Sequence, residues 1–355
     1  MTIATSASAS RNGDGMVATD RSTSRSKPTW RAVRPTPVRP PRRRFGMAPY
    51  RSHVASAIDP GAEATDQPGG FVVVVDPGDR IHFLDWGGAG EPGVVLIHGL
   101  AGSGLAWTPV ARRLVARRRV VAMDLRGHGL SDAPTDTGAY DLDVLASDVV
   151  AVAEGSGALD DEISGESVRA DEAAAVIVAG HGFGAIVAAA AATRLGSRCS
   201  RLVLIDGGLA DVASATGQDV DEFLRTLDEP PEVMRSMAAY LGDRRSWDPA
   251  TWDADQEEAA RAAVVETPAG RLVLATRPHA LEACVRTMFE YRPEDVLPNV
   301  KAPIVAVRRR TPGDDDATGI AGDVPAGVRV VDVSAPGHNL LRYRPDEVTA
   351  AILAR

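Results

Sequence analysis

The amino-acid sequence predicts an α/β fold in which helices cover both faces of a mostly parallel sheet. Between residues 70 and 208, short runs rich in Val, Ile and Leu alternate with segments of helical periodicity. Parallel strands buried on both faces form continuous apolar runs of this kind, and they need a helical crossover between them. At 355 residues the chain is long enough to bury one large core of this class.

The predicted elements follow one another in a regular order. Two strands flank a Pro-Gly-Asp turn at residues 77–79, which predicts a hairpin at the start of the sheet. The next strands and helices are expected, in chain order, at residues 93–99, 106–117, 118–125, 142–154, 174–180, 183–196 and 201–208. Two strands and a helix complete the predicted core, at residues 302–310, 328–335 and 345–354. We therefore place this core at residues 66–208 and 297–355.

Residues 209–296 interrupt the alternation of strands and helices and have helical patterns. In open α/β sheets, ligands bind at the carboxyl ends of the strands. We therefore expect residues 209–296 to form an all-helical cap over that edge. Residues 157–172 are acidic and lack apolar periodicity, which predicts a surface loop.

The N-terminal part of the chain differs from the rest in charge. Residues 1–55 contain eleven Lys and Arg against two Asp, a net charge of +9, and since the whole chain carries −9 the remainder carries −18. This part is rich in Arg, Pro and Ser and cannot bury enough apolar surface to offset its ordering entropy. We expect residues 1–65 to be a disordered tail.

The basic tail allows three interpretations: attraction to nucleic acid or an anionic membrane, an export signal built on the arginines at 42–44, or a true start at Met16 or Met47. No apolar segment follows the arginines, so export is not expected. The acidic body would repel phosphates, which argues against nucleic acid as the main substrate. Without an apolar run of 18 residues no membrane span is expected, and the sequence predicts a cytoplasmic protein of undetermined oligomeric state.

Deleting residues 1 to about 60 is expected to leave the melting temperature and ligand binding unchanged, because the tail has too little apolar surface to extend a core. Calorimetry of the full-length and truncated chains measures this directly. A large fall in melting temperature on truncation would show that the tail packs against the body.

Two further features argue against a metal or cofactor. Cys199 and Cys284 are far apart and lack metal-binding or redox spacing, so we expect two buried thiols and no disulfide. The stretch GLAGSG at residues 99–104 is glycine-rich, but it lacks the Gly-Lys-Ser/Thr ending and the spacing of nucleotide-binding loops. No cofactor is expected.

Four segments resemble, in the right order, motifs of the α/β-hydrolase superfamily, in particular its esterase-like and epoxide-hydrolase-like branch with a helical cap. VVLIHGLAGSGLAW looks like the family's strand and oxyanion loop, and VVAMDLRGHGLSD like its following strand and turn. AGHGFGA looks like its nucleophile elbow, and APGHNLLRYRP like its catalytic-histidine loop. The resemblance covers residues 68–355 and implies a hydrolase.

Gly182 stands where this family usually has Ser, and sometimes Asp or Cys, as the nucleophile. The elbow is a tight strand-to-helix turn, and Gly180 and Gly184 match the small residues that allow strand and helix to approach. The turn is expected to need a positive φ, which glycine adopts without a Cβ penalty. The fold therefore tolerates Gly182, but the ordinary acyl-enzyme mechanism loses its attacking atom.

The resemblance implies roles for other residues. His338 would be the general base, and the backbone N–H groups of Leu100 and Phe183 would form an oxyanion hole. The acid has two candidate positions, each after a strand, and a third alternative is that neither serves. These positions are Asp206 and the group Asp314, Asp315 and Asp316.

The remaining motif histidines have structural interpretations. We expect His98, His128 and His181 to pack and hydrogen-bond around the loops, with the His181 side chain pointing away from the site. Ser103 and Ser131 lie in glycine-rich loops near the carboxyl edge and are weak candidates for a replacement nucleophile.

Three interpretations of Gly182 stay open. The first is a hydrolase in which His338 activates water directly, with water filling the space of the missing side chain. The second is a pseudoenzyme that binds a small molecule or a partner without turnover. The third is a sequence error or an engineered knock-out, since one base change converts Ser to Gly. Apolar and aromatic residues of the expected cap favour a small, uncharged or lipophilic ligand: Trp247, Trp252, Met288 and Phe289.

Overall fold

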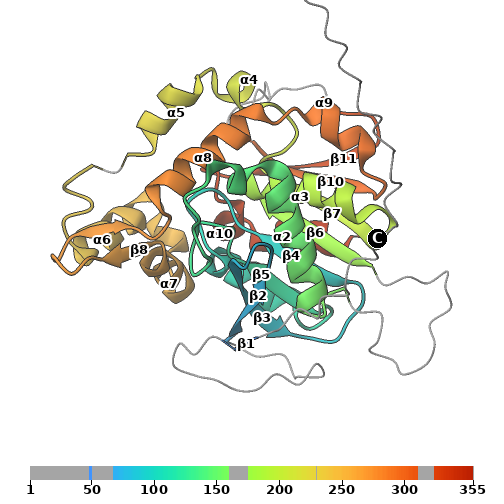
Figure 1. Ribbon diagram of the computed structural model, residues 1–355, viewed down its shortest axis with the longest axis horizontal. Coiled ribbons are helices and arrows are strands. Elements are labelled where there is room, and N and C mark those ends of the chain that lie inside the picture. The colour runs from blue at the N-terminus through green and yellow to red at the C-terminus, as the bar shows by residue number, and fades with distance from the viewer. Residues whose placement is uncertain (1–47, 50–66, 160–174, 229, 311–323, 355) are drawn as a thin grey trace, which may run out of the picture. The chain divides into compact units, whose positions relative to one another are not determined.

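The computed structural model describes residues 48–49, 67–159, 175–228, 230–310 and 324–354 (Figure 1). The predicted tail lies outside these residues except for Ala48–Pro49, which form β1 and pair antiparallel with β2. Most of the predicted acidic loop and the group Asp314 to Asp316 also lie outside the described residues.

The described strands of the core form a nine-stranded sheet in the order β1-β2-β3-β5-β4-β6-β7-β10-β11. The strands from β5 to β11 in this order pair in parallel, while β3 is antiparallel to both β2 and β5. Their bounds are β2 Gly69–Val74, β3 Arg80–Gly87, β4 Gly93–Ile97, β5 Val120–Met123, β6 Val176–His181, β7 Cys199–Ile205, β10 Ile304–Arg310 and β11 Val328–Ser334. The predicted fold class and the opening hairpin are confirmed.

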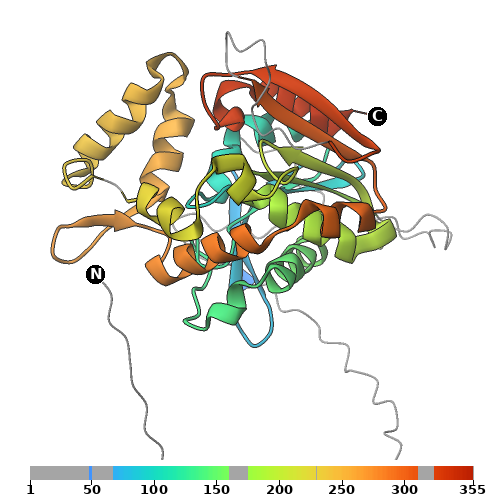
Figure 2. The ribbon, with the colours of Figure 1, turned by 90° about the horizontal axis from the view of Figure 1, so that it is seen from above.

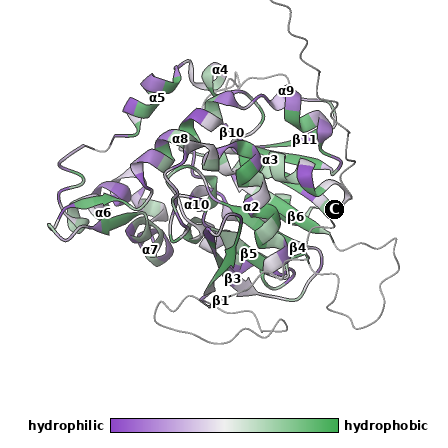
Figure 3. Cartoon of the chain, in the orientation of Figure 1, coloured by the Kyte–Doolittle hydropathy of each residue, from purple (hydrophilic) through white to green (hydrophobic). Residues whose placement is uncertain are grey.

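Helices lie on both faces of this sheet (Figure 2). Because side chains alternate along a strand, Val95 and Ile97 of β4 join the hydrophobic cluster that includes α2 and α3, whereas Val94 and Leu96 join the one that includes α1 and α11. Figure 3 shows the resulting apolar character of the central strands and of α3. The core helices are α1 Thr108–Leu114, α2 Leu142–Gly155, α3 Phe183–Leu195, α10 Leu340–Tyr343 and α11 Pro345–Leu353, with the short turns η1 Gly104–Trp107, η2 Thr137–Tyr140 and η3 Gly196–Arg198.

Residues 209–296, called the inserted segment below, connect β7 to β10. They form the helices α4 Val212–Thr216, α5 Val220–Thr226, α6 Met237–Trp247, α7 Ala254–Ala262, α8 Pro278–Glu290 and α9 Pro293–Val296, with η4 Pro249–Thr251; η5 Leu297–Asn299 follows. The prediction of an all-helical segment is wrong in one place. Val264–Glu266 (β8) pairs antiparallel with Leu272–Leu274 (β9), since two short β-favouring runs flank a turn that contains Gly270 at φ 73°.

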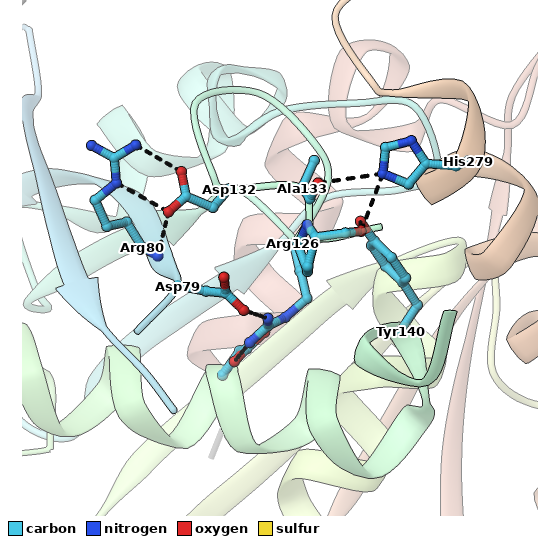
Figure 4. Close-up of polar contacts among 9 residues, drawn as sticks. Asp79, Arg80, Arg126, Asp132, Ala133, Tyr140 and His279 are labelled. Carbon is cyan, nitrogen blue, oxygen red and sulfur yellow. Dashed lines mark hydrogen bonds and ion pairs between the residues drawn. The ribbon is translucent and has the colours of Figure 1, made fainter. Parts of the chain in front are cut away.

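A cluster of ion pairs anchors the loop after β5 (Figure 4). The Arg126 guanidinium is buried and donates two hydrogen bonds to Asp148 of α2, both at 2.9 Å, and a third to Asp79. Arg80 pairs with Asp132 at 2.8 Å near the end of the same loop. These contacts hold the loop against the β2–β3 hairpin.

The two thiols are buried, as the sequence predicts. Burial raises the pKa of Cys199 and of Cys284 to about 12, so both remain protonated at neutral pH. In the described part of the chain, no helix combines the length and the apolar character that crossing a membrane requires.

Candidate active site

The elbow between β6 and α3 has the geometry that its glycines predict. A Cβ on Gly180 would lie 2.0 Å from the carbonyl oxygen of Gly184, and a Cβ on Gly184 would lie 2.4 Å from that of Ile97, so both positions require glycine. Gly182 has φ 55° and ψ −117°, and its N–H donates to the carbonyl oxygen of Ile205 at 2.9 Å. The strand thus ends in a sharp turn at Gly182, directly before the N-terminus of α3.

The loop after β11 brings His338 to this turn. A Cβ built on Gly182 would lie only 2.9 Å from His338 Nε2. That distance is shorter than real Cβ contacts, so the imidazole takes part of the space in which a nucleophile's Cβ would lie.

Asp206, at the end of β7, holds the other side of the imidazole. His338 Nδ1 lies 2.7 Å from Asp206 Oδ2, and the Asp206 side chain is only 4% exposed, against 58% for His338. Burial opposes the charge on Asp206, but the hydrogen bond and the attraction of His338 hold the pKa of Asp206 below its usual value. An ionised carboxylate only accepts, so Nδ1 donates to Asp206, and the other ring nitrogen, Nε2, faces Gly182.

The structure therefore brings one of the two acid candidates to His338. Asp314, Asp315 and Asp316 lie outside the described residues. Asp206 itself has φ 45°, a conformation that non-glycine residues rarely adopt. Its N–H donates to the carbonyl oxygen of Val307 at 2.8 Å, which fixes it to the adjacent β10.

Arg309 of β10 is a site residue that the sequence reasoning did not identify. Its N–H donates to Asp206 Oδ1 at 3.3 Å, and its Nε lies 3.4 Å from Asp206 Oδ2. Asp206 is thus held between the His338 ring and Arg309. Three consecutive arginines at the end of a strand were visible in the sequence, but nothing local indicated that one of them faces the acid.

The prediction that His181 points away from the site is wrong. Its ring centroid lies 4.5 Å from that of His338, and its Nε2 donates to the His338 carbonyl oxygen at 2.9 Å. Burial, with a smaller effect of nearby His338, lowers the pKa of His181 to about 3, so this ring stays neutral. The backbone turns sharply at Gly182, and His181 consequently supports the His338 loop.

The other motif residues have the packing roles expected of them. The His98 ring accepts from the Leu125 N–H at 2.9 Å and lies 2.7 Å from the Gly99 carbonyl oxygen, and burial lowers its pKa. Burial lowers the pKa of His128 to about 3. Ser131 Oγ donates to the Asp124 carbonyl oxygen at 2.7 Å.

A cavity of about 670 Å³ opens above Gly182. This volume is within the range of small-molecule pockets. The expected oxyanion residues Leu100 and Phe183 both line it, whereas Ser103 and Ser131 are not among its lining residues. The lining is mainly apolar, and its ionisable side chains are His181, Asp206, Arg308, Arg309 and His338.

The inserted segment supplies a large part of this lining. Side chains from α4, α5, α6 and α8 and from the preceding loop contribute to it, namely Leu209, Ala210, Val212, Ala215, Thr216, Phe223, Leu227, Trp247 and Met288. Of the four cap residues that suggested a lipophilic ligand, Trp247 and Met288 line the cavity. The segment therefore forms the wall opposite the strand ends.

Comparison with known proteins agrees with this geometry. A family model described as the alpha/beta hydrolase family matches residues 94–351. Epoxide hydrolase 4 of Mus musculus is 36% identical over 109 residues, which is 30% of either chain. The matches to the first three relatives, all epoxide hydrolases, span less than a third of each relative's length. Lipase LipV of Mycobacterium tuberculosis is 28% identical over 284 residues, covering 78% of this chain and 97% of the lipase.

Solved structures show the same fold. The crystal structure of E-2-(acetamidomethylene)succinate hydrolase superposes with a TM-score of 0.61 at 21% identity, covering 77% of this chain and 94% of that one. A thioesterase domain from the curacin biosynthetic pathway has a TM-score of 0.58 at 23% identity, covering 81% and 99%. Together with the family model, which matches well over half of the sequence, these findings establish that the chain belongs to the alpha/beta hydrolase family.

Proposed function

We propose that this chain hydrolyses small, neutral, ester-like molecules without a covalent intermediate, because His338 activates water directly. The observation that carries the proposal is the 2.7 Å contact between His338 Nδ1 and Asp206 Oδ2, with Nε2 turned toward a glycine. A base aligned by a buried carboxylate, beside a cavity of about 670 Å³, is what proton abstraction requires. No side chain at position 182 competes for that base.

The proposed reaction has one attacking atom, the oxygen of a water. His338 Nε2 takes a proton from this water as its oxygen bonds to the ester carbonyl carbon. The N–H groups of Leu100 and Phe183 stabilise the resulting oxyanion. The tetrahedral species then collapses, the C–O bond to the alcohol breaks, and the leaving oxygen takes the proton from His338.

The chemistry of the lining favours an ester over an epoxide. Epoxide hydrolases and a lipase are both among the relatives. Opening an epoxide needs a proton donor at the ring oxygen, and the lining contributed by the described residues includes no tyrosine, lysine or cysteine. An ester carbonyl needs only hydrogen-bond donors at its oxygen, which backbone N–H groups supply.

A second candidate function is ligand binding without turnover. It is favoured by Gly182 itself, because the site has no side chain where the family has its nucleophile while the cavity of about 670 Å³ beside it is present. Binding of a non-hydrolysable ketone, together with no ester hydrolysis above the solvent rate, would support this candidate over the first.

Hydrolysis is expected to rise as the pH is raised from mildly acidic to neutral values and then to level off. The sign follows from the mechanism, since only neutral His338 has a lone pair to accept a proton. His181, with a pKa of about 3, and Asp206, with a lowered pKa, do not change charge in this range. A rate of p-nitrophenyl butyrate hydrolysis that falls as pH rises would contradict the assignment.

A further inference from the structure

Part of the inserted segment has a hydrophobic cluster of its own. Residues 233–274, called the lobe below, bury Tyr240 of α6, Val264 of β8 and Leu272 of β9 against one another. The partly buried side chains around them also come from the lobe: Val233, Met234, Met237, Leu241, Ala260 and Leu274. Apolar packing therefore holds the lobe together, whereas its position on the core depends on other contacts.

Two arginines of the core reach the lobe, one at the first turn of α7 and the other at the turn between α6 and α7. Arg112 of α1 donates from Nη1 to Asp255 Oδ2 at 2.6 Å. Arg342 of α10 donates from Nε to Thr251 Oγ1 at 2.5 Å and from Nη2 to the carbonyl oxygen of Asp248. The Arg342 guanidinium also lies over the ring of Trp252, 5.6 Å from its centroid.

The end of the inserted segment is anchored separately, through α8. His279 Nε2 lies 3.3 Å and 3.1 Å from the carbonyl oxygens of Ala133 and Pro134 (Figure 4). Thr287 Oγ1 donates to the carbonyl oxygen of Tyr140 at 2.9 Å. These contacts fix α8 to the core through residues other than Arg112 and Arg342.

The α6–α7 turn adjoins both the cavity and the His338 loop. Trp247, the last residue of α6, lines the cavity, is 62% exposed and directly precedes Asp248. Arg342 follows His338 by four residues, and Leu341 beside it also lines the cavity. The hydrogen bonds of Arg342 therefore connect the wall that carries Trp247 to the loop that carries the base.

We propose that Trp247 covers the apolar part of the ligand, and that Arg112 and Arg342 are positioning residues that fix its distance from His338. The inference rests on the ligand class of the proposed function and adds the residues that select it. A large aromatic ring exposed at a pocket is stabilised when an apolar ligand covers it. Arginine suits the positioning role because its planar guanidinium group donates several hydrogen bonds in fixed directions at once.

The test uses hexanophenone, a neutral ketone that has the outline of the ester butyl benzoate and cannot be hydrolysed. We expect Trp247→Ala to weaken its binding about tenfold, measured by isothermal titration calorimetry. Arg342→Met and Arg112→Met are each expected to weaken binding of hexanophenone about fivefold, and the double variant more than either. Without these contacts the lobe is less ordered, and ordering it on binding costs free energy. Arg342→Lys keeps the positive charge but not the planar guanidinium group. Its affinity for hexanophenone should therefore lie between those of the natural protein and Arg342→Met.

Matched controls lie beside each positioning residue. Arg113, next to Arg112 on α1, pairs with Asp346 of α11 at 2.6 Å and does not reach the lobe through that contact. Arg344, two residues after Arg342, donates to the carbonyl oxygen of Ser334 within the core. Arg113→Met and Arg344→Met should therefore bind hexanophenone with the affinity of the natural protein.

Hydrogen exchange supplies a readout that needs no ligand. In the double variant, the amides of α6 and α7 should exchange faster while those of β6 do not change. If hexanophenone fails to bind the natural protein, the role of Trp247 and the proposed ligand class are both overturned, and the exchange rates alone decide the role of the arginines. Equal exchange and equal affinity in the double variant and the two controls would overturn the positioning role.

Discussion

Gly182→Ser is expected to create a protein that reacts with a serine-directed fluorophosphonate probe and shows a burst of p-nitrophenol from an activated ester, whereas the natural protein does neither. The new hydroxyl would stand between His338 and the N-terminus of α3, within reach of a base that Asp206 already aligns at 2.7 Å. Because the serine replaces a free water by a nucleophile held beside its base, we expect the rate to rise by a factor of about 100. Gel fluorescence and stopped-flow kinetics measure the two effects.

The serine has a structural cost, which the contacts of Gly182 define. Its Cβ would meet His338 Nε2 at 2.9 Å, so the imidazole must move back by a few tenths of an ångström. The ring is 58% exposed and is the far end of a side chain, which makes that movement easy. The φ of 55° adds strain of about 1–3 kcal/mol, so a melting temperature a few degrees lower is expected.

Gly182→Ala is the matched control, because it adds the same Cβ and the same strain without a hydroxyl. It should lose the same stability and remain unlabelled. If Gly182→Ser is as stable as Gly182→Ala and also remains unlabelled, the site has diverged by more than the nucleophile. The binding function would then be the better account.

His338→Ala is expected to reduce ester hydrolysis by about two to four orders of magnitude, the usual contribution of a general base. Asp206 and His181 hold the ring in place as the proposed base. Its removal leaves the water without a proton acceptor. Initial rates with p-nitrophenyl butyrate measure the loss. Added imidazole should restore part of the activity, because the site is open to solvent at His338. A variant that keeps its rate would rule out water activation by this residue.

The sequence predicted most of the core because strands buried on both faces have a strong local signal. The elbow is a clear example, since Gly180, Gly182 and Gly184 each occupy a backbone position that excludes or disfavours a side chain. The hairpin of β8 and β9 was missed because each strand has only three residues, too short to show a period. The residues on either side have helical patterns, which favoured a helix at these two short strands as well.

The site was harder to predict where it depends on contacts between distant residues. Asp206 and the Asp314 group both follow a strand, and β7 and β10 are neighbours in the sheet, so chain order alone did not separate them. The turn at Gly182 brings His181 against the His338 loop, which the strand's alternation does not indicate. Arg342 meets Asp248 across 94 residues, a separation at which the sequence has no local signal.

The central claim is that the natural protein hydrolyses esters without forming a covalent intermediate. Rapid-quench mass spectrometry during steady-state turnover of p-nitrophenyl butyrate tests it most directly, with Gly182→Ser measured alongside as the positive control for an acyl adduct. We expect the natural protein to release butyrate while its mass stays unchanged and Gly182→Ser gains one butyryl group. A butyryl adduct on the natural protein, or the absence of any turnover above that of His338→Ala, would contradict the account.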